Sequence, residues 1–281
     1  MYRSLDGLGP RGNRPRDFRR DALQYYNCLG QTEGNIEKRI WCQVSHRWLQ
    51  ALRTTKAAHI VPHFLDLSEL GPLLFGSRSD DLYGPGNTLI MASALERWFD
   101  KYLFVIVPVD KTVPIRRWKT ELIDKSIEKS TYCDYDDAFG CELHGKELKF
   151  RSENRPVSRF LYFHFVMALV RIKDLNRPNW QATWARYYEH QPFPTPGPCL
   201  RKSMLLAIAT HFQTTDMNVV SSWISAQGFE YPQLLTDQET ARIAKKVHDG
   251  IEAAIRKVEE REENFEDDSE YEYDSPEESS D

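Results

Sequence analysis

Apolar positions recur with two different periods along the chain, and each period predicts a different kind of element. Short runs rich in Ile, Val and aromatic residues, bounded by Pro, Gly or charged residues, predict strands over residues 40–44, 46–52, 56–62 and 103–109. Apolar residues three or four positions apart predict helices over residues 93–102, 155–175, 180–188 and 236–262. A chain that mixes separate strands and helices in this way is typical of the α+β class.

The longest apolar run covers residues 160–170 and is interrupted by His164. Because a helix needs about 20 apolar residues to cross a bilayer, this run predicts a buried helix rather than a membrane span. The first twenty residues contain arginines but no apolar segment, so no secretory signal is expected. We therefore expect a soluble, intracellular protein with no membrane partner. The sequence favours neither nucleus nor cytoplasm.

One face of the last predicted helix carries five apolar residues, Ile243, Val247, Ile251, Ile255 and Val258. A continuous apolar stripe of this kind needs a surface to pack against. The sequence leaves open whether that surface belongs to the body of this chain or to a protein partner.

Charge is divided unevenly along the chain. The whole chain carries -5, and residues 259–281 carry -12, with thirteen acidic residues and one arginine, which leaves +7 on residues 1–258. A basic body favours a polyanionic partner, whereas an acidic tail is expected to stay solvated. Composition and pattern together predict five segments: a flexible basic arm (1–20), a first domain (21–150), a helical extension (151–230), a C-terminal helix (231–262) and an acidic disordered tail (263–281).

The five cysteines are scattered, and no pair has the CxxC spacing of a zinc ribbon. Their odd number gives no support to a disulfide framework. The sequence therefore predicts neither a structural zinc site nor stabilising disulfides.

Residues in the first domain have the chemistry needed to hydrolyse a phosphodiester. His59 lies near the end of a predicted strand, and Asn87 follows a glycine-rich loop at the mouth of a short predicted helix. A histidine can take a proton from water near neutral pH. Glu96 and Asp100 lie one turn apart on that helix and offer the hard oxygen ligands that suit Mg²⁺ or Mn²⁺. Asn87 is expected either to orient His59 or to bind the metal.

Each of these residues also has a purely structural interpretation. Ser93 and Glu96 fit a capping box at the start of the helix, and Asp100 fits an ion pair with Arg97. Asn87 is an ordinary turn residue, and a single histidine at a strand end is more often packed than catalytic. Only the joint pattern favours the chemical interpretation.

Four short pieces of sequence carry this joint pattern, and each has a characteristic order and spacing. They are Cys42-Gln43-Val44-Ser45, Ala57-Ala58-His59-Ile60-Val61-Pro62, Gly86-Asn87-Thr88-Leu89-Ile90 and Trp98-Phe99-Asp100-Lys101. Together they resemble the HNH endonuclease family, in particular fungal proteins that carry an HNH nuclease domain of this type. The resemblance extends over about residues 35–229.

The resemblance implies a ββα-metal (His-Me finger) core, in which two strands and a helix hold one divalent ion, and it makes the first domain HNH nuclease-like. It implies an endonuclease, a metal-dependent hydrolase of nucleic-acid phosphodiester bonds, with His59 as the general base. Asn87 falls on the asparagine position of the family. The implied cofactor is Mg²⁺ or Mn²⁺, and the implied partner is nucleic acid, with DNA preferred over RNA.

Two positions depart from the family pattern. Glu96 stands where the family has a metal-ligand histidine, and Ala58 stands where many members have an acidic ligand. Glu96 and Asp100 remain candidate ligands, and His63 is a candidate substitute. The alternative function is therefore a catalytically degenerate HNH-fold module that binds nucleic acid or protein.

Basic residues accompany the start of the helical extension. Arg155, Arg159, Arg171 and Lys173 are candidates for contacts with phosphates, which would give salt-dependent affinity without sequence preference. The structural alternative is that they are solvent-exposed residues on the surfaces of helices.

Overall fold

The structure is a computed structural model of the 281-residue chain. It describes residues 15–30, 39–50, 54–62, 71, 74–133, 138–190, 192–194 and 237–269. Most of the predicted basic arm, the candidate ligand His63 and the last part of the predicted acidic tail lie outside the described residues.

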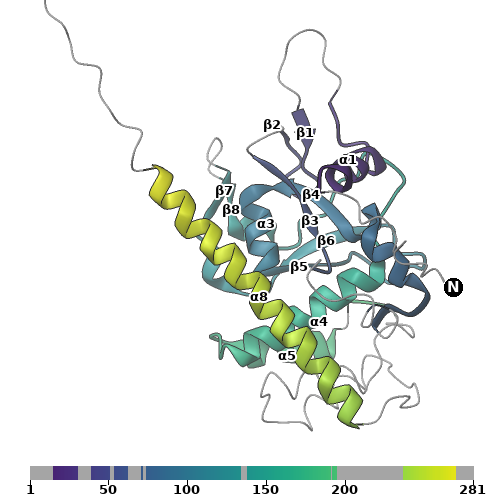
Figure 1. The fold of residues 1–281 in the computed structure, drawn as a ribbon, viewed down its shortest axis with the longest axis vertical. Helices are drawn as coiled ribbons and strands as arrows, with labels where there is room; N and C mark the ends of the chain where they lie inside the picture. The colour runs from purple at the N-terminus through teal and green to yellow at the C-terminus, as the bar shows by residue number, and fades with distance from the viewer. Residues whose placement is uncertain are drawn as a thin grey trace, which may run out of the picture.

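An antiparallel strand pair followed directly by a helix lies at the centre of the fold (Figure 1). Strand β3 (Thr55–His59) pairs with β4 (Thr88–Ala92), and α3 (Ser93–Asp100) continues from the end of β4. Helix α3 contacts both strands, so the three elements form one packed unit.

The structure corrects the predicted position of Asn87, which precedes strand β4 rather than a helix. Ile90 of β4 packs with residues of α1 (Pro15–Tyr25), while Leu89 and Met91 join the main core on the other face. A strand that is covered on both faces has a continuous apolar run instead of an alternating one. Five such residues do not distinguish a strand from the beginning of a helix.

The described residues contain three further two-stranded antiparallel sheets. They are β1 (Arg39–Trp41) with β2 (Trp48–Gln50), β5 (Phe104–Pro108) with β6 (Trp118–Leu122), and β7 (Thr131–Cys133) with β8 (Ala138–Phe139). Short 3₁₀ helices occur at η1 (Gly76–Tyr83), η2 (Pro85–Asn87), η3 (Lys125–Ile127) and η4 (Gly140–Leu143). Strands β1, β2, β3 and β5 overlap the four predicted strands, and the mixture of small sheets and helices confirms the α+β class.

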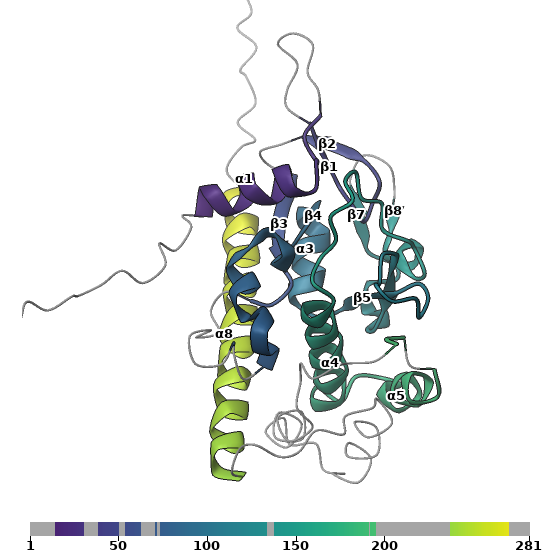
Figure 2. The same cartoon turned by 90° about the vertical axis from the view of Figure 1, so that its right-hand side faces the viewer.

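Helix α4 (Ser158–Asp174) fills the middle of the main core. Its residues 160–170 are all buried and it packs against β5, which confirms the predicted buried helix. Helix α5 (Trp180–Glu189) follows and packs on α4 (Figure 2). Among the helices that the structure describes, none combines the length and the apolar run needed to span a membrane.

His164 connects α4 to the end of α3. Its buried imidazole stacks on the ring of Phe99 with 3.8 Å between ring centroids, and its Nε2 lies 3.0 Å from the Phe99 carbonyl oxygen. Burial lowers the pKa of His164 to about 3, so the neutral imidazole donates its Nε2–H to that carbonyl. His164 is therefore a packing residue of the core.

The apolar face of α8 (Asp237–Ser269) packs on the body of the chain. The residues of this face that join the core cluster of α4 are Val247, Ile251 and Ile255. Glu252, on the neighbouring face, forms a salt bridge with Arg171 of α4, and α8 also contacts α3. The sequence leaves open whether the apolar face of α8 packs on the body of this chain or on a protein partner. In the structure it packs on the body of this chain.

Two segments predicted to be flexible are partly helical. Helix α1 begins at Pro15, so residues 15–20 of the predicted arm are helical, and α8 reaches Ser269, beyond the predicted end at residue 262. Helix α1 is held because Ala22 packs in a second core cluster with Ile90. A packed helix adds one hydrogen bond for each further residue, so α8 extends past its last core contact into the acidic segment.

The cysteines whose side chains the structure describes, Cys28, Cys42 and Cys141, are free thiols. Cys28 and Cys42 are buried, and burial raises the pKa of Cys28 to about 12. Cys28 is therefore a protonated, small apolar core residue at neutral pH.

We predict that Ile251→Ala lowers the free energy of unfolding by about 2–5 kcal/mol, because it opens a cavity between α8 and the core. Urea denaturation of the full chain measures the change. The matched control is Lys257→Ala, an exposed residue of the same helix, which should stay within about 0.5 kcal/mol of the native chain. Equal stability of the two variants would show that α8 does not pack on the body in solution.

Candidate active site at the end of strand β3

His59 is the last residue of β3 and is paired with Thr88 of β4. Its side chain is half-buried. Because side chains alternate along a strand, His59 shares one face of β3 with Thr55 and Ala57, while Ala58 points to the other face, where it is buried in the main core. The candidate base thus lies on the face opposite the core that α3 helps to form.

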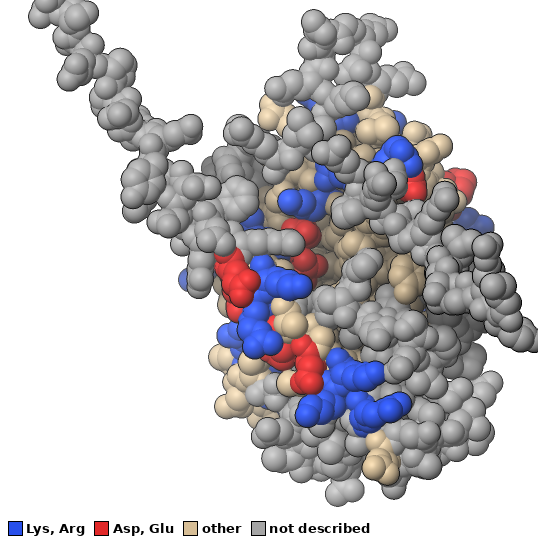
Figure 3. All heavy atoms as spheres, viewed as in Figure 1, with Lys and Arg blue, Asp and Glu red and all other residues tan. Residues whose placement is uncertain are grey.

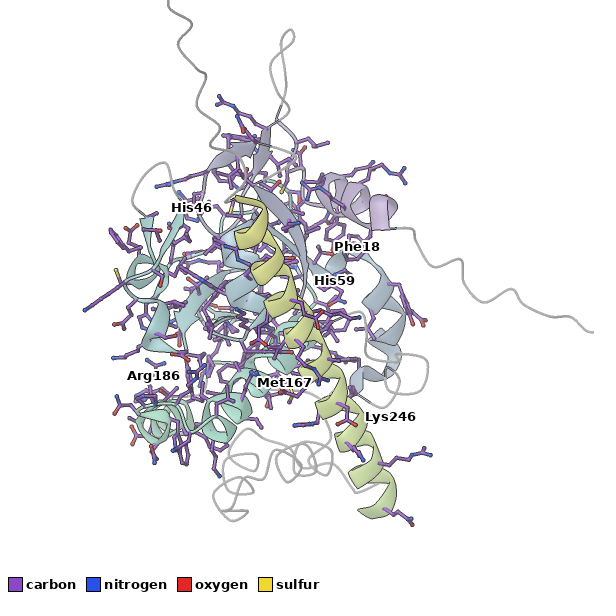
Figure 4. All side chains as sticks on the ribbon, turned by 60° about the vertical axis from the view of Figure 1, so that its left-hand side comes forward. Phe18, His46, His59, Met167, Arg186 and Lys246 are labelled. Carbon is purple, nitrogen blue, oxygen red and sulfur yellow. The ribbon has the colours of Figure 1, made fainter. Side chains whose placement is uncertain are left out.

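Helix α1 covers this face of β3. The ring of Phe18 stacks on the imidazole of His59, with 4.1 Å between ring centroids and 4° between the ring planes (Figure 4). The neighbouring Arg19 donates from Nη1 to the Thr55 carbonyl oxygen at 2.6 Å and from Nη2 to Thr55 Oγ1 at 2.8 Å. Two adjacent residues of α1 therefore hold it against both ends of β3. Phe18 was not predicted from the sequence. Its spacing of four residues from Ala22 could have indicated that both lie on the packed face of one helix.

Asn87 holds the chain together where the pairing of β3 and β4 ends. Its buried amide donates from Nδ2 to the carbonyl oxygens of Val61 and Leu82, each at 3.0 Å, and its Oδ1 accepts the Val61 N–H at 2.8 Å. Its backbone carbonyl accepts the N–H of Ile60 at 3.1 Å. Through its side chain and its backbone carbonyl, Asn87 therefore fixes the backbone of the two residues that follow His59.

Helix α3 carries the two candidate carboxylate ligands. Glu96 and Asp100 are both half-buried and lie one turn apart, while Leu95 and Phe99 are buried in the core. Ala92, rather than the expected Ser93, occupies the N-cap position of this helix. The helix begins one residue earlier than a capping box of Ser93 and Glu96 requires because β4 leads into it without a loop.

The described residues do not complete a metal site. No group of three His, Cys, Asp or Glu side chains lies close enough to hold an ion in the part of the chain that the structure describes. The amide oxygen of Asn87 is engaged with the backbone, and Ala58 supplies no ligand. Glu96 and Asp100 have suitable oxygen donors but form only part of a ligand set.

Gln43 is a structural residue that sequence reasoning did not single out. Its buried side chain accepts the N–H of Ile90 through Oε1 at 2.8 Å, and its own backbone N–H donates to the Ile90 carbonyl oxygen at 3.0 Å. These two bonds attach the turn after β1 to the middle of β4. The only feature of the sequence that pointed to Gln43 is that it belongs to Cys42-Gln43-Val44-Ser45, the first of the four pieces that resemble the HNH family.

The four basic residues predicted to contact phosphates all have partners within the chain. Arg155 donates to the carbonyl oxygens of Arg116, Ser152 and Asn154 at 2.7–2.8 Å, and Arg159 donates to that of Phe75 at 2.9 Å. Arg171 pairs with Glu252, and the buried Nζ of Lys173 lies 5.3 and 5.4 Å from the ring centroids of Trp180 and Trp184. This engagement argues against a primary role in phosphate binding, most strongly for Arg171 and Lys173.

Charges of both signs alternate on the face that α8 crosses (Figure 3). The exposed residues of α8 include the basic Arg242, Lys245, Lys246, Arg256 and Lys257 and the acidic Asp249, Glu259 and Glu260. The described residues of this face therefore do not form a continuous basic surface.

These elements define an α+β protein in which a strand-end histidine, a buried asparagine and a helix with two carboxylates follow one another in the chain. Residues 42–107 match the family model described as HNH endonuclease, so this segment of the chain is similar to the HNH family. It covers β3, β4, α3 and Asn87 and is shorter than the resemblance expected over residues 35–229. Comparison with curated proteins and with solved structures gave no match.

We predict that Asn87→Ala lowers the free energy of unfolding by about 2–5 kcal/mol, because it leaves three buried backbone groups without their partner. Thermal and urea denaturation measure the loss. Gln181→Ala removes an exposed amide on α5 and should change stability by less than about 0.5 kcal/mol. A loss below about 1 kcal/mol for Asn87→Ala, which is the net value of a single hydrogen bond, would contradict this role of Asn87.

We predict that Phe18→Ala moves the ring protons of His59 downfield in the NMR spectrum, because they lose the shielding face of a stacked ring. The variant should also lose about 0.5–1.5 kcal/mol of aromatic pairing. Phe139→Ala, which removes an exposed phenylalanine of β8, is the matched control. Unchanged His59 signals would mean that α1 leaves this face in solution.

Proposed function

We propose that residues 42–107 form a ββα-metal HNH module that hydrolyses phosphodiester bonds of nucleic acid, with His59 as general base. The observation that carries the proposal is the order of a strand-end histidine, a clamping asparagine and a helix within the segment that matches the HNH family. DNA is the proposed substrate in preference to RNA.

His59 is suited to take a proton from water. Its side chain is only half-buried, Phe18 stacks on the imidazole, and Asn87 holds the backbone that follows. Proton transfer to His59 lets the water oxygen form a bond to phosphorus while the bond to the leaving oxygen breaks. A positioned base of this kind contributes about 10²–10⁴ in rate.

HNH nucleases generally use a divalent metal, and Mg²⁺ and Mn²⁺ are the ions proposed here. The described side chains do not complete a ligand set, so the role derived for this chain is confined to the proton transfer at His59. Glu96 and Asp100 are the proposed oxygen ligands, and His63 is the proposed additional one.

A second function, binding of nucleic acid or protein by a catalytically degenerate HNH module, is favoured by one specific observation. Phe18 covers one face of His59, on the side of β3 that a substrate would have to reach. The absence of an acidic residue at Ala58 and the glutamate at position 96 favour the same function.

A nicking assay on supercoiled plasmid with Mg²⁺ or Mn²⁺ tests the proposal. We predict that the native chain cleaves and that His59→Ala reduces the rate by about 10²-fold or more. His248→Ala, which changes a histidine on the outside of α8, should retain the native rate. Equal cleavage by the native chain and His59→Ala would remove His59 as the base.

Glu96→His separates the two functions. A native chain that is inert, together with a Glu96→His variant that cleaves, would establish a domain that has lost its metal. Its present function would then be binding, which a gel-shift series at increasing salt measures directly.

A further inference from the structure

A second site lies in a cavity between the β5–β6 hairpin and α5. Its volume is about 410 Å³, and it is independent of His59. Figure 4 shows Arg186 of α5 on a different part of the molecule from His59 and Phe18. The charged and polar residues of the lining are Asp110, Lys111, Lys119, Glu121, His144, Arg186, Tyr187 and His190.

The floor of the cavity is a connected polar network. The buried Tyr187 donates its hydroxyl to Glu121 Oε2 at 2.5 Å and accepts a hydrogen bond from Arg186 Nη2 at 3.0 Å. Lys119 Nζ lies 2.8 Å from Glu121 Oε1. These contacts hold the Arg186 guanidinium 4.6 Å from the centre of the Tyr187 ring, and among the described residues its hydrogen bond to Tyr187 uses one of its five N–H groups.

Both carboxylates of the lining already have partners. Although burial opposes it, hydrogen bonds from Lys119 and Tyr187 hold the pKa of Glu121 below its ordinary value, so the carboxylate is ionised and compensated. Asp110 accepts the N–H of Thr112 at 3.0 Å and lies 3.6 Å from Arg117, a cation outside the cavity lining. The charge of Glu121 also acts on Arg186 and compensates it in part, whereas the contacts of Asp110 are with Thr112 and Arg117.

His144 adds a donor with a defined orientation. Its Nδ1 accepts the backbone N–H of Leu122 at 3.3 Å, which places the proton of the neutral ring on Nε2. His144 and His190 both line the cavity, and their side chains are exposed. The lining thus combines Lys111, Lys119 and Arg186 with two carboxylates and two histidines, so its cations outnumber its carboxylates.

We propose that this cavity binds the phosphate group of a small phosphomonoester of the size of a nucleoside monophosphate. Arg186 and Lys111 supply charge, His144 supplies an N–H donor, and Pro108, Val109 and Pro192 offer an apolar wall for the rest of the ligand. Arginine and lysine are the side chains that proteins most often direct at phosphate oxygens. A phosphate at the end of a nucleic-acid strand offers the same chemistry.

Isothermal titration of the full chain tests the proposal with inorganic phosphate, a nucleoside monophosphate and the same nucleoside without phosphate. The first two should bind and the third should not. Arg186→Ala should weaken the monophosphate about tenfold, because a charge-assisted hydrogen bond is lost. Arg116→Ala removes an exposed arginine outside the cavity and should leave binding unchanged.

Two oligonucleotides distinguish the source of the phosphate. Stronger binding of a strand with a terminal phosphate than of the same strand without one, reduced by Arg186→Ala, would support a strand end as ligand. Binding of the monophosphate alone would support a free nucleotide. No binding of phosphate or monophosphate at millimolar concentration, or equal binding by the native chain and Arg186→Ala, would overturn the site.

Discussion

The side chain of Asn87 makes three hydrogen bonds to the backbone of Val61 and Leu82 at the point where β3 and β4 stop pairing. Each of those backbone groups is removed from water, and a buried polar group without a partner costs about 1–3 kcal/mol. The Asn87 amide therefore continues the hydrogen bonding between the two segments where the backbone pairing of β3 and β4 ends. It fixes the backbone that follows His59. Asn87 immediately precedes β4 and binds Val61, two residues after β3 ends, so one residue joins the two strands where their pairing ends.

The two faces of β3 pack against different parts of the protein. The face with Ala58 is buried in the core that contains Leu95 and Phe99 of α3, and the face with His59 is covered by α1. A side chain on the first face could meet α3, whereas His59 meets Phe18. This division explains why the histidine and the helix carboxylates do not gather into a three-ligand group among the described residues, and the element that covers His59 is α1, which lies outside the matched segment.

Most of the framework could be predicted from the sequence, because helices such as α4 and strands such as β5 are long, apolar and bounded by polar residues. The site was predictable only as a set of residues in order. The stacking of Phe18 on His59 brings together positions 41 residues apart, and the helical spacing of Phe18 to Ala22 does not encode that contact. The docking of Gln43 on Ile90 is likewise a long-range contact that no periodicity encodes.

Charge composition predicts a basic body, but the structure uses much of that charge internally. Arg19, Arg159 and Arg171 each bind a backbone or carboxylate oxygen of the same chain. An arginine with such a partner must lose it before it can bind phosphate, which offsets part of the gain. Net charge alone is therefore a poor guide to where this chain could bind a polyanion, because much of its basic charge already has a partner within the chain.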